Sequence, residues 1–258
     1  MSIEKKRSLL RISKEKFLNS ITPNIINKYQ EEVFQMENKD QETKRIKTII
    51  KSKNLGKNLN PDYIGKYKGE SFIIAGCGSS INSYSDFSDH YVIGVNDIER
   101  ILTPDFLVVV NEIRTFMRGR WYYVDKTLSP VIFSHLENPG PIERSENLVN
   151  IKLGERDSAN LDDLTKVDFT TNSPYMAAII AYQMGARKIG IVGVDFTNNH
   201  FFSETGAHRL SKNIIDIDSQ YMNLRIELEK RGVKVANLSS ISALEAWPKM
   251  DLETFNKL

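Results

Sequence analysis

The chain of 258 residues has few of the residues on which several classes of protein depend. Its single cysteine, Cys77, cannot form a disulfide within the chain, and no Cys and His residues have zinc-site spacing. No apolar run approaches the roughly 20 residues that a membrane-spanning helix needs. The start, Met1 to Arg7, leads into no long apolar stretch, so no secretory signal is expected. These absences exclude a disulfide-rich or zinc-finger domain and predict a cytoplasmic protein without a transmembrane segment.

Positive charge is concentrated at one end of the chain. Residues 1–69 hold 16 Lys and Arg against 8 Asp and Glu, whereas residues 70–258 hold 19 against 25. We interpret this basic arm first as a solvated helical face, and an anionic partner for the arm is the alternative. Aromatic residues are sparse in the arm, which argues against stacking on single-stranded nucleic acid. A homo-oligomer is also among the expected partners.

The apolar pattern divides the chain into two parts. Residues 1–69 read as polar amphipathic helices followed by a glycine-containing linker over Asn54–Gly69. Residues 70–258 alternate short apolar runs with helical segments, which predicts an α/β fold: a doubly wound, mostly parallel, Rossmann-like sheet with an N-terminal helical extension. The expected strands are Phe72–Ala75, Tyr91–Val95, Phe106–Val110, Val131–Ser134, Ile189–Val194 and Val233–Leu238.

Two helices are expected in the second part. The first begins at Asn172 or Ser173, either of which can cap it, has Pro174 in its first turn and ends at Gly185. The second covers residues 212–231. Residues 137–168 are polar and turn-rich, which predicts a long loop, with a lid as one interpretation.

Two of the expected strands run directly into glycine. Gly76-Cys77-Gly78-Ser79-Ser80 follows the first strand, and Gly193-Val194-Asp195 ends a later one. In an open α/β sheet the chain turns over a ligand at such points, and glycine lets backbone N–H groups approach a phosphate. The first segment is neither a full dinucleotide fingerprint nor a P-loop, so a tight strand-to-helix turn is the alternative.

Polar side chains follow three of the strands. Asn96 and Asn111 can each donate and accept hydrogen bonds, which suits a base or a ribose. Asp195 could hold a metal, a ribose hydroxyl or a catalytic proton, and the alternative is that it caps a turn. Because the carboxyl ends of parallel strands share one crevice, these side chains are expected to lie together.

Three further residues are candidates for chemistry. His200 and His208 lie in the loop after Asp195, where either could act as general acid or base, and surface exposure is the alternative for each. Cys77 lies at a potential helix N-terminus, which would lower its pKa. We nevertheless interpret Cys77 as a packing or backbone residue.

Several segments resemble known families. Residues 74–81 are similar to the glycine-rich opening of the campylobacter-type bacterial sialyltransferases, the motility-accessory-factor proteins and the archaeal hydroxymethylpterin diphosphokinase-like domain. Residues 171–178 and 185–196 resemble the second block of these families. Residues 208–213 and 235–240 resemble their C-terminal segments, so that the resemblance covers about residues 71–250.

The resemblance implies roles for individual residues. Gly76, Gly78, Ser79 and Asn96 would hold the nucleotide, and His208 would act as general base on an acceptor hydroxyl. The full set of binding candidates is Gly76, Cys77, Gly78, Ser79, Ser80, Asn96, Asn111, Ser173, Ser239 and Ser240. His208 and Asp195 are the catalytic candidates, and no resident metal is expected.

Three functions remain open at this point. The leading prediction is a glycosyltransferase that moves a sugar, with a CMP-linked sialic-acid-type sugar as one donor, to a hydroxyl of a glycan or another acceptor. The first alternative is a Mg²⁺-dependent diphosphokinase that acts on a small alcohol such as a hydroxymethylpterin, with Asp195 helping to hold the metal. The second is a non-catalytic nucleotide-binding domain that docks a partner. No tightly bound cofactor is expected in the leading case.

Overall fold

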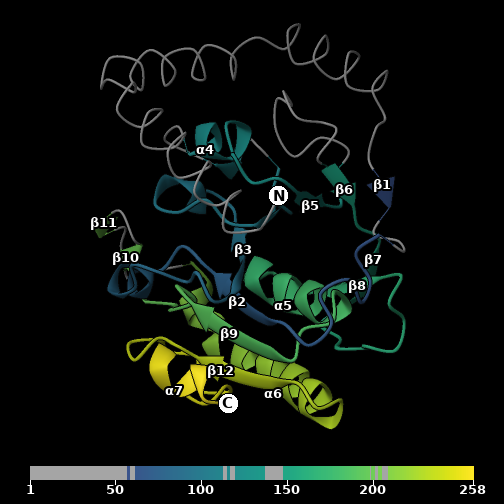
Figure 1. Ribbon diagram of the computed structural model, residues 1–258. Coiled ribbons are helices and arrows are strands. Elements are labelled where there is room, and N and C mark those ends of the chain that lie inside the picture. Colours follow the sequence, from purple (N-terminus) through teal and green to yellow (C-terminus); the bar gives the residue numbers. More distant parts are fainter. Residues whose placement is uncertain are drawn as a thin grey trace, which may run out of the picture.

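The computed structural model (Figure 1) describes residues 57–58, 62–112, 115–116, 120–136, 148–197, 199–200, 203–204 and 209–258. Most of the basic arm lies outside the described residues. So does His208, which is far from the arm in the sequence. Within the described ranges, no helix combines the length and the apolar character that crossing a membrane requires.

Eight parallel strands form the central sheet: the six that the sequence predicts, and β1 and β6 besides. Their spatial order is β1 (Lys57–Asn58), β6 (Leu148–Asn150), β5 (Ile132–Ser134), β4 (Phe106–Val108), β3 (Tyr91–Val95), β2 (Ser71–Ala75), β9 (Lys188–Val192) and β12 (Lys234–Asn237). From β2 the chain adds β3, β4, β5 and β6 on one side, and it later adds β9 and β12 on the other. The order therefore reverses between β2 and β9, and such a reversal is where open α/β sheets bind their ligands.

Helices cover both faces of the sheet, so the fold is doubly wound (Figure 1). Alternate residues of β2 serve the two faces: Phe72 and Ile74 pack into the core with α5 (Ser173–Gln183) and α6 (Ile214–Lys230), and Ile73 packs into the opposite core. Burial on both faces explains the continuous apolarity of the central strands. The opposite face is covered by η1 (Ser79–Ser83), η2 (Ile98–Arg100), α4 (Trp121–Asp125) and α7 (Leu252–Asn256).

Helix α5 begins where the sequence predicts. The Asn172 side chain caps it by accepting a hydrogen bond from the backbone N–H of Tyr175 at 3.3 Å, and Pro174 lies in its first turn. The helix is buried almost all round, as expected for a helix packed on a central sheet. It stops before Gly185, which has a φ of +103° that disfavours any other residue. This placement fixes the N-terminus of α5 at the carboxyl edge of the sheet.

Two expectations about loops need correction. The long loop predicted over residues 137–168 instead contains β6, β7 (Leu153–Arg156) and the start of β8 (Val167–Phe169). These strands have only three or four residues each, and β7 and β8 also carry charged side chains, so they lack the longer apolar run that marks a strand in the sequence. The remaining short elements are β10 (Asn199–His200), β11 (Ser203–Glu204) and η5 (Arg209–Asn213).

The linker predicted over Asn54–Gly69 is also partly structured. Strand β1 lies within it and pairs with β6. The Tyr67 ring packs edge-on against Phe72 and Phe106, with ring centroids 6.1 and 5.3 Å apart. The backbone N–H of Tyr67 donates to the carbonyl oxygen of Met184 at 2.8 Å. Residues 62–69 are therefore attached to the sheet and to the end of α5.

Candidate functional site

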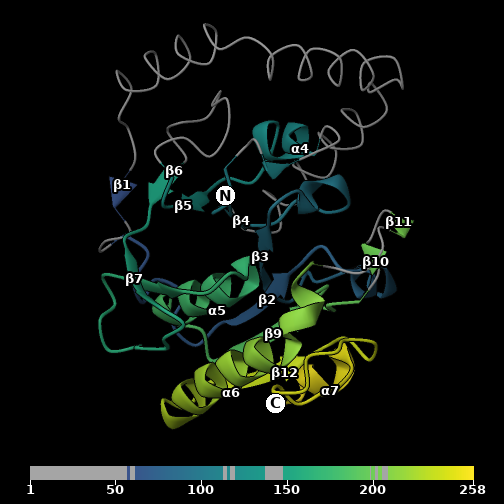
Figure 2. The same ribbon diagram turned by 180° about the vertical axis from the view of Figure 1, so that it is seen from behind.

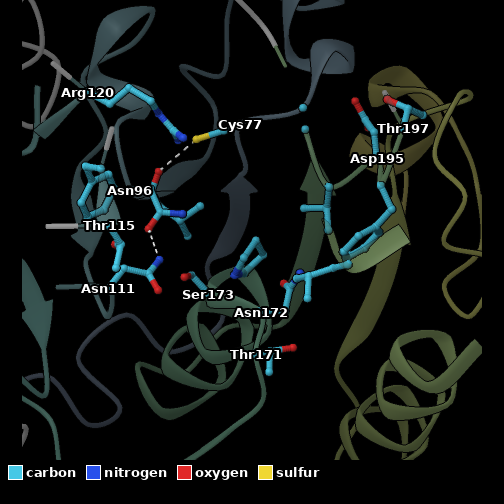
Figure 3. Close-up of a pocket in the computed structure, with 18 residues that line it drawn as sticks. Cys77, Asn96, Asn111, Thr115, Arg120, Thr171, Asn172, Ser173, Asp195 and Thr197 are labelled. Atoms are coloured by element: carbon cyan, nitrogen blue, oxygen red, sulfur yellow. Dashed lines mark hydrogen bonds between the residues drawn. The ribbon is translucent and has the colours of Figure 1, made fainter. Parts of the chain in front are cut away.

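A pocket of about 420 Å³ opens at the carboxyl edge of the sheet, where the strand order reverses (Figure 3). It is lined by the turns that follow β2, β3 and β9, by residues after β4, and by the first residues of α5. Of the sequence-predicted site residues, Cys77, Gly78, Asn96, Asn111, Ser173 and Asp195 line it. The structure thus brings together side chains from five separate segments, as parallel strands sharing one edge require.

The two glycine turns lie against each other. The N–H of Gly76 donates to the carbonyl oxygen of Val192 at 2.8 Å, and that of Gly78 donates to the carbonyl oxygen of Gly193 at 2.7 Å. A Cβ at Gly76 would lie 2.4 Å from the Gly193 oxygen, far closer than real Cβ atoms come. These glycines are therefore needed for the contact between the two strand ends.

Ser80 and Asp195 tie the same two turns together through side chains. The Ser80 N–H donates to Asp195 Oδ2 at 2.8 Å, and the Ser80 hydroxyl donates to Oδ1 at 2.6 Å. The Ser80 Oγ in turn accepts from the N–H of Gly193 at 2.9 Å. Both donors of Ser80, one of the predicted binding residues, are thus used inside the protein. The N–H groups of Cys77 and Ser79 donate to no described residue, and of these two residues Cys77 lines the pocket.

A buried ion pair lies beside the first turn. Arg120 donates to both carboxylate oxygens of Asp97, whose side chain is fully buried. Burial alone would lower the pKa of Arg120, but the hydrogen bonds and the charge of Asp97 outweigh it and raise that pKa. Arg120 also lines the pocket, so it brings a permanent positive charge to the site.

The thiol of Cys77 lies against this ion pair. Its Sγ is 3.5 Å from the carbonyl oxygen of Val95 and 3.7 Å from Asp97 Oδ1 (Figure 3 shows the first contact). Burial, and next the negative charge of Asp97, raise the pKa of the Cys77 thiol well above its usual value. The lowering that a helix N-terminus predicts is therefore wrong, and the thiol is protonated near neutral pH. The interpretation of Cys77 as a packing residue agrees with these contacts.

Asn96 and Asn111 form a pair at the ends of neighbouring strands (Figure 3). Asn111 Nδ2 donates to Asn96 Oδ1 at 3.0 Å, which leaves Asn96 Nδ2 as a donor and Asn111 Oδ1 as an acceptor beside the pocket. Asn96 has a φ of +55°, and Phe196, which follows the β9 turn and also lines the pocket, has a φ of +53°. A bulky residue in this backbone region is strained, and such strain concentrates at ligand sites.

The N-terminus of α5 forms another wall of the pocket. Asn172 Oδ1, besides capping the helix, accepts a hydrogen bond from the hydroxyl of Tyr221 on α6 at 2.7 Å. Ser173 is only 6% exposed and lines the pocket, and its hydroxyl makes no hydrogen bond to any described residue. Because a helix N-terminus carries partial positive charge and free N–H groups, this wall favours an anionic group.

Some of the predicted residues lie elsewhere. Ser239 and Ser240 follow β12 and do not line this pocket. Ser239 is buried, with its N–H donating to Asn237 Oδ1 at 3.1 Å, and Ser240 is exposed. His208 lies outside the described residues, and for His200, in β10, the structure describes only the backbone. Within the described residues, no group of three or more His, Cys, Asp or Glu is placed to hold a metal ion.

The ion pair beside the pocket, Asp97 with Arg120, is not among the residues predicted from the sequence. Asp97 follows directly after Asn96, so its position at a strand end could have indicated that it lies near the site. Arg120 lies outside any motif, directly before α4, and no pattern in the sequence connects it to Asp97.

Comparison with known proteins shows similarity at the level of the fold. No protein-family model matches the chain, and no curated protein matches it in sequence. Among solved structures, the MAf glycosyltransferase from Magnetospirillum magneticum AMB-1 aligns with a TM-score of 0.53 and 13% identity over 81% of this chain. The chain has a glycosyltransferase-like fold. It spans only 38% of the length of that protein.

A second solved structure is less similar. The sialyltransferase CstII from Campylobacter jejuni, in complex with cytidine-5'-monophosphate, aligns with a TM-score of 0.44 and 12% identity. That alignment covers 71% of this chain and 85% of CstII.

Proposed function

We propose that the protein is a glycosyltransferase that takes a sugar from a nucleotide-activated donor and transfers it to an acceptor hydroxyl. The observation that carries the proposal is the pocket of about 420 Å³ at the reversal of strand order, where Asn96, Asn111 and Ser173 converge. The volume is in the range of sites that enclose a small ligand, and the fold, shared with MAf glycosyltransferase, supports the class of reaction.

The donor phosphate would lie between the first turn and the N-terminus of α5. There it would accept hydrogen bonds from the N–H groups of Cys77 and Ser79 and from the Ser173 hydroxyl, with the helix dipole favouring its charge. Asn96 Nδ2 and Asn111 Oδ1 present a donor and an acceptor side by side, which suits the hydroxyl or amide groups of a sugar or base. A CMP-linked sugar, which the sequence resemblance implies, is the first donor to test.

In the reaction, the acceptor oxygen would form a bond to the anomeric carbon as the bond from that carbon to the phosphate oxygen breaks. His208 would take the proton of the acceptor hydroxyl as general base. The backbone donors and Arg120 would stabilise the negative charge that develops on the leaving phosphate. Because both oxygens of the Asp195 carboxylate accept from Ser80, we give Asp195 a positioning role and assign the base to His208 alone.

Binding tests the first half of the proposal. The thermal midpoint should rise with a nucleotide or its sugar conjugate, because a ligand that binds only the folded state stabilises it. Ser173→Ala and Asn96→Ala should weaken the affinity, whereas Ser240→Ala, on an exposed residue away from the pocket, should leave it unchanged. The proposal fails if the thermal unfolding midpoint does not change with CMP, UMP or GDP or with any of their sugar conjugates.

Turnover tests the second half. With a donor found by binding, His208→Ala should lower the rate of sugar transfer about 10²–10⁴-fold with little change in nucleotide affinity, and His200→Ala should lower it much less. Product mass distinguishes the alternatives, because a diphosphokinase would transfer two phosphates from a nucleoside triphosphate and would need Mg²⁺. Binding without transfer to any acceptor would favour the non-catalytic alternative.

A further inference from the structure

The side-chain amide of Asn172, at the start of α5, is hydrogen-bonded through its oxygen only. Asn172 Oδ1 accepts from the backbone N–H of Tyr175 at 3.3 Å and from the hydroxyl of Tyr221 at 2.7 Å. Its Nδ2 donates to no described residue, although Asn172 is only 7% exposed and lines the pocket. Nearly buried polar groups are almost always paired, so this nitrogen points to a partner that enters the pocket.

The neighbours of this amide determine which of its ends faces them. The oxygen and the nitrogen of a carboxamide have nearly the same shape, so their hydrogen-bond partners distinguish them. The backbone N–H of Tyr175 can only donate, so it must face the oxygen. Burial raises the pKa of the Tyr221 hydroxyl well above its usual value, so the hydroxyl keeps its proton and can donate as well. The Nδ2 group is therefore turned away from both tyrosines.

Capping of α5 needs only the oxygen of Asn172. Aspartate caps a helix about as well, because the cap is a side-chain oxygen that accepts from a backbone N–H. Asparagine adds an N–H donor that aspartate lacks, and the next residue, Ser173, brings a hydroxyl that also has no partner among the described residues. Figure 3 shows Asn172 and Ser173 next to each other at the pocket. Two nearly buried donors at the positive end of a helix suit the oxygens of an anion.

Tyr221 lies outside the pocket and is itself held rigidly. Figure 2 shows its helix, α6, next to α5. The fully buried Tyr221 ring packs edge-on against Tyr175 and Trp247, with ring centroids 5.4 and 5.8 Å apart. Its hydrogen bond to Asn172 is shorter than that of the Tyr175 N–H, so the hydroxyl is the stronger restraint on rotation of the amide.

We propose that Asn172 is a further binding residue, whose Nδ2 donates to a phosphate oxygen in the pocket, and that Tyr221 is the positioning residue that holds the amide in this orientation. The Ser173 hydroxyl would bind a second oxygen of the same phosphate. Only the statement that this phosphate belongs to a nucleotide donor rests on the proposed function. The donors themselves recognise the phosphate group, so inorganic phosphate is a probe that needs neither base nor sugar.

Titration calorimetry of the full-length chain with CMP and with inorganic phosphate measures the effect of each group. Asn172→Asp keeps the capping oxygen but replaces the donor with an oxygen that repels an anion, so it should weaken binding of both probes about 10-fold or more. Tyr221→Phe keeps the ring and removes the hydroxyl, which should weaken binding about 3- to 10-fold. Circular dichroism and the unfolding midpoint verify that each variant folds.

Tyr175→Phe is the matched control for Tyr221→Phe. It also removes the hydroxyl of a buried tyrosine from the same core, but this hydroxyl donates to the carbonyl oxygen of Ser158 at 2.8 Å and does not contact Asn172. Tyr175→Phe should therefore bind both probes like the wild type. A loss of affinity equal to that of Tyr221→Phe would mean that any loosening of this core weakens binding, and it would overturn the positioning role.

A double variant tests whether Tyr221 acts through the amide. In the Asn172→Ala background there is no amide to orient, so adding Tyr221→Phe should change the affinity less than about 2-fold. If Tyr221→Phe lowers the affinity as much in that background as in the wild type, Tyr221 does not act through Asn172 and the positioning role is wrong.

The two probes separate this inference from the proposed function. Binding of inorganic phosphate that depends on Asn172, without binding of CMP, UMP or GDP, would overturn the nucleotide donor and support the phosphate site. Nucleotide binding that Asn172→Asp does not weaken would overturn the role of Asn172 and leave the proposed function standing. A wild-type protein that binds neither phosphate nor any of these nucleotides overturns both.

Discussion

Ser80 and Asp195, which follow two different central strands, are joined by two hydrogen bonds of 2.8 and 2.6 Å. This contact fixes the turn after β2 to the turn after β9 at the floor of the pocket. It also satisfies a buried carboxylate, whose isolation in the protein interior would be strongly unfavourable.

Ser80→Ala should lower the free energy of unfolding by about 1–3 kcal/mol, because it leaves one oxygen of the buried Asp195 carboxylate without its donor. Urea unfolding followed by circular dichroism measures the change. Ser240→Ala, on an exposed residue, is the control and should stay within about 0.5 kcal/mol of the wild type. An unchanged midpoint for Ser80→Ala would show that water replaces the serine hydroxyl at no cost.

Gly193 and Gly232 offer a matched pair, since both have positive φ, +69° and +77°. A Cβ at Gly232 meets nothing within 4 Å, whereas one at Gly193 would lie 2.3 Å from the Gly76 oxygen. Gly232→Ala should therefore cost only the backbone strain, about 1–3 kcal/mol. Gly193→Ala should lower the free energy of unfolding clearly more than Gly232→Ala does. Equal decreases in the two variants, measured by urea unfolding, would show that the contact between the turns does not contribute.

Cys77 should react slowly with alkylating reagents in the folded protein. Its pKa is raised, so at any given pH less of it is the reactive thiolate than in the unfolded chain. The rate of modification by iodoacetamide should keep rising with pH beyond the value at which the urea-unfolded protein has levelled off. A folded-state rate that levels off at lower pH than the unfolded one would mean that the helix N-terminus controls the thiol.

Shortening the chain tests where the folded domain begins. A chain that starts at Lys57 keeps β1 and the contacts of residues 62–69, so it should fold and bind nucleotide like the full chain. A chain that starts at Ser71 loses the Tyr67 ring contacts and its hydrogen bond to Met184, and should be less stable by at least about 2 kcal/mol. Equal unfolding midpoints for the two would support the boundary at residue 69 that the sequence predicts.

The sequence predicts the centre of this fold well for a physical reason. Strands such as β2 and β3 are buried on both faces, so they appear as continuous apolar runs between turn residues. The start of α5 is equally clear, because Asn172 and Pro174 have the cap and first-turn roles that their chemistry favours. Strand β6, which has only three residues, is too short to carry this signal.

The site is predictable only in its position. Strand ends locate Asn96, Asn111 and Asp195, but nothing in the sequence says that Asp195 is held by Ser80. The sequence does not distinguish a glycine that lets a phosphate approach the backbone from one that lets another segment of backbone approach. Gly76 lies against the backbone of Gly193. Arg120 is brought to Asp97 by tertiary folding alone.

The pairing of β2 with β9 has a consequence for how the chain reaches its native state during synthesis. Ser71 lies beside Lys188, so the pair β2–β9 cannot form until most of the chain has left the ribosome. Contacts between such distant segments require closure of a long loop and form slowly. Until then, the edge of β2 that pairs with β9 has no strand beside it. In the folded protein β2 is buried on both faces. An aggregation-prone strand edge is therefore exposed while residues 76–187 are translated. We expect the dependence of folding on chaperones to increase with the length of that interval.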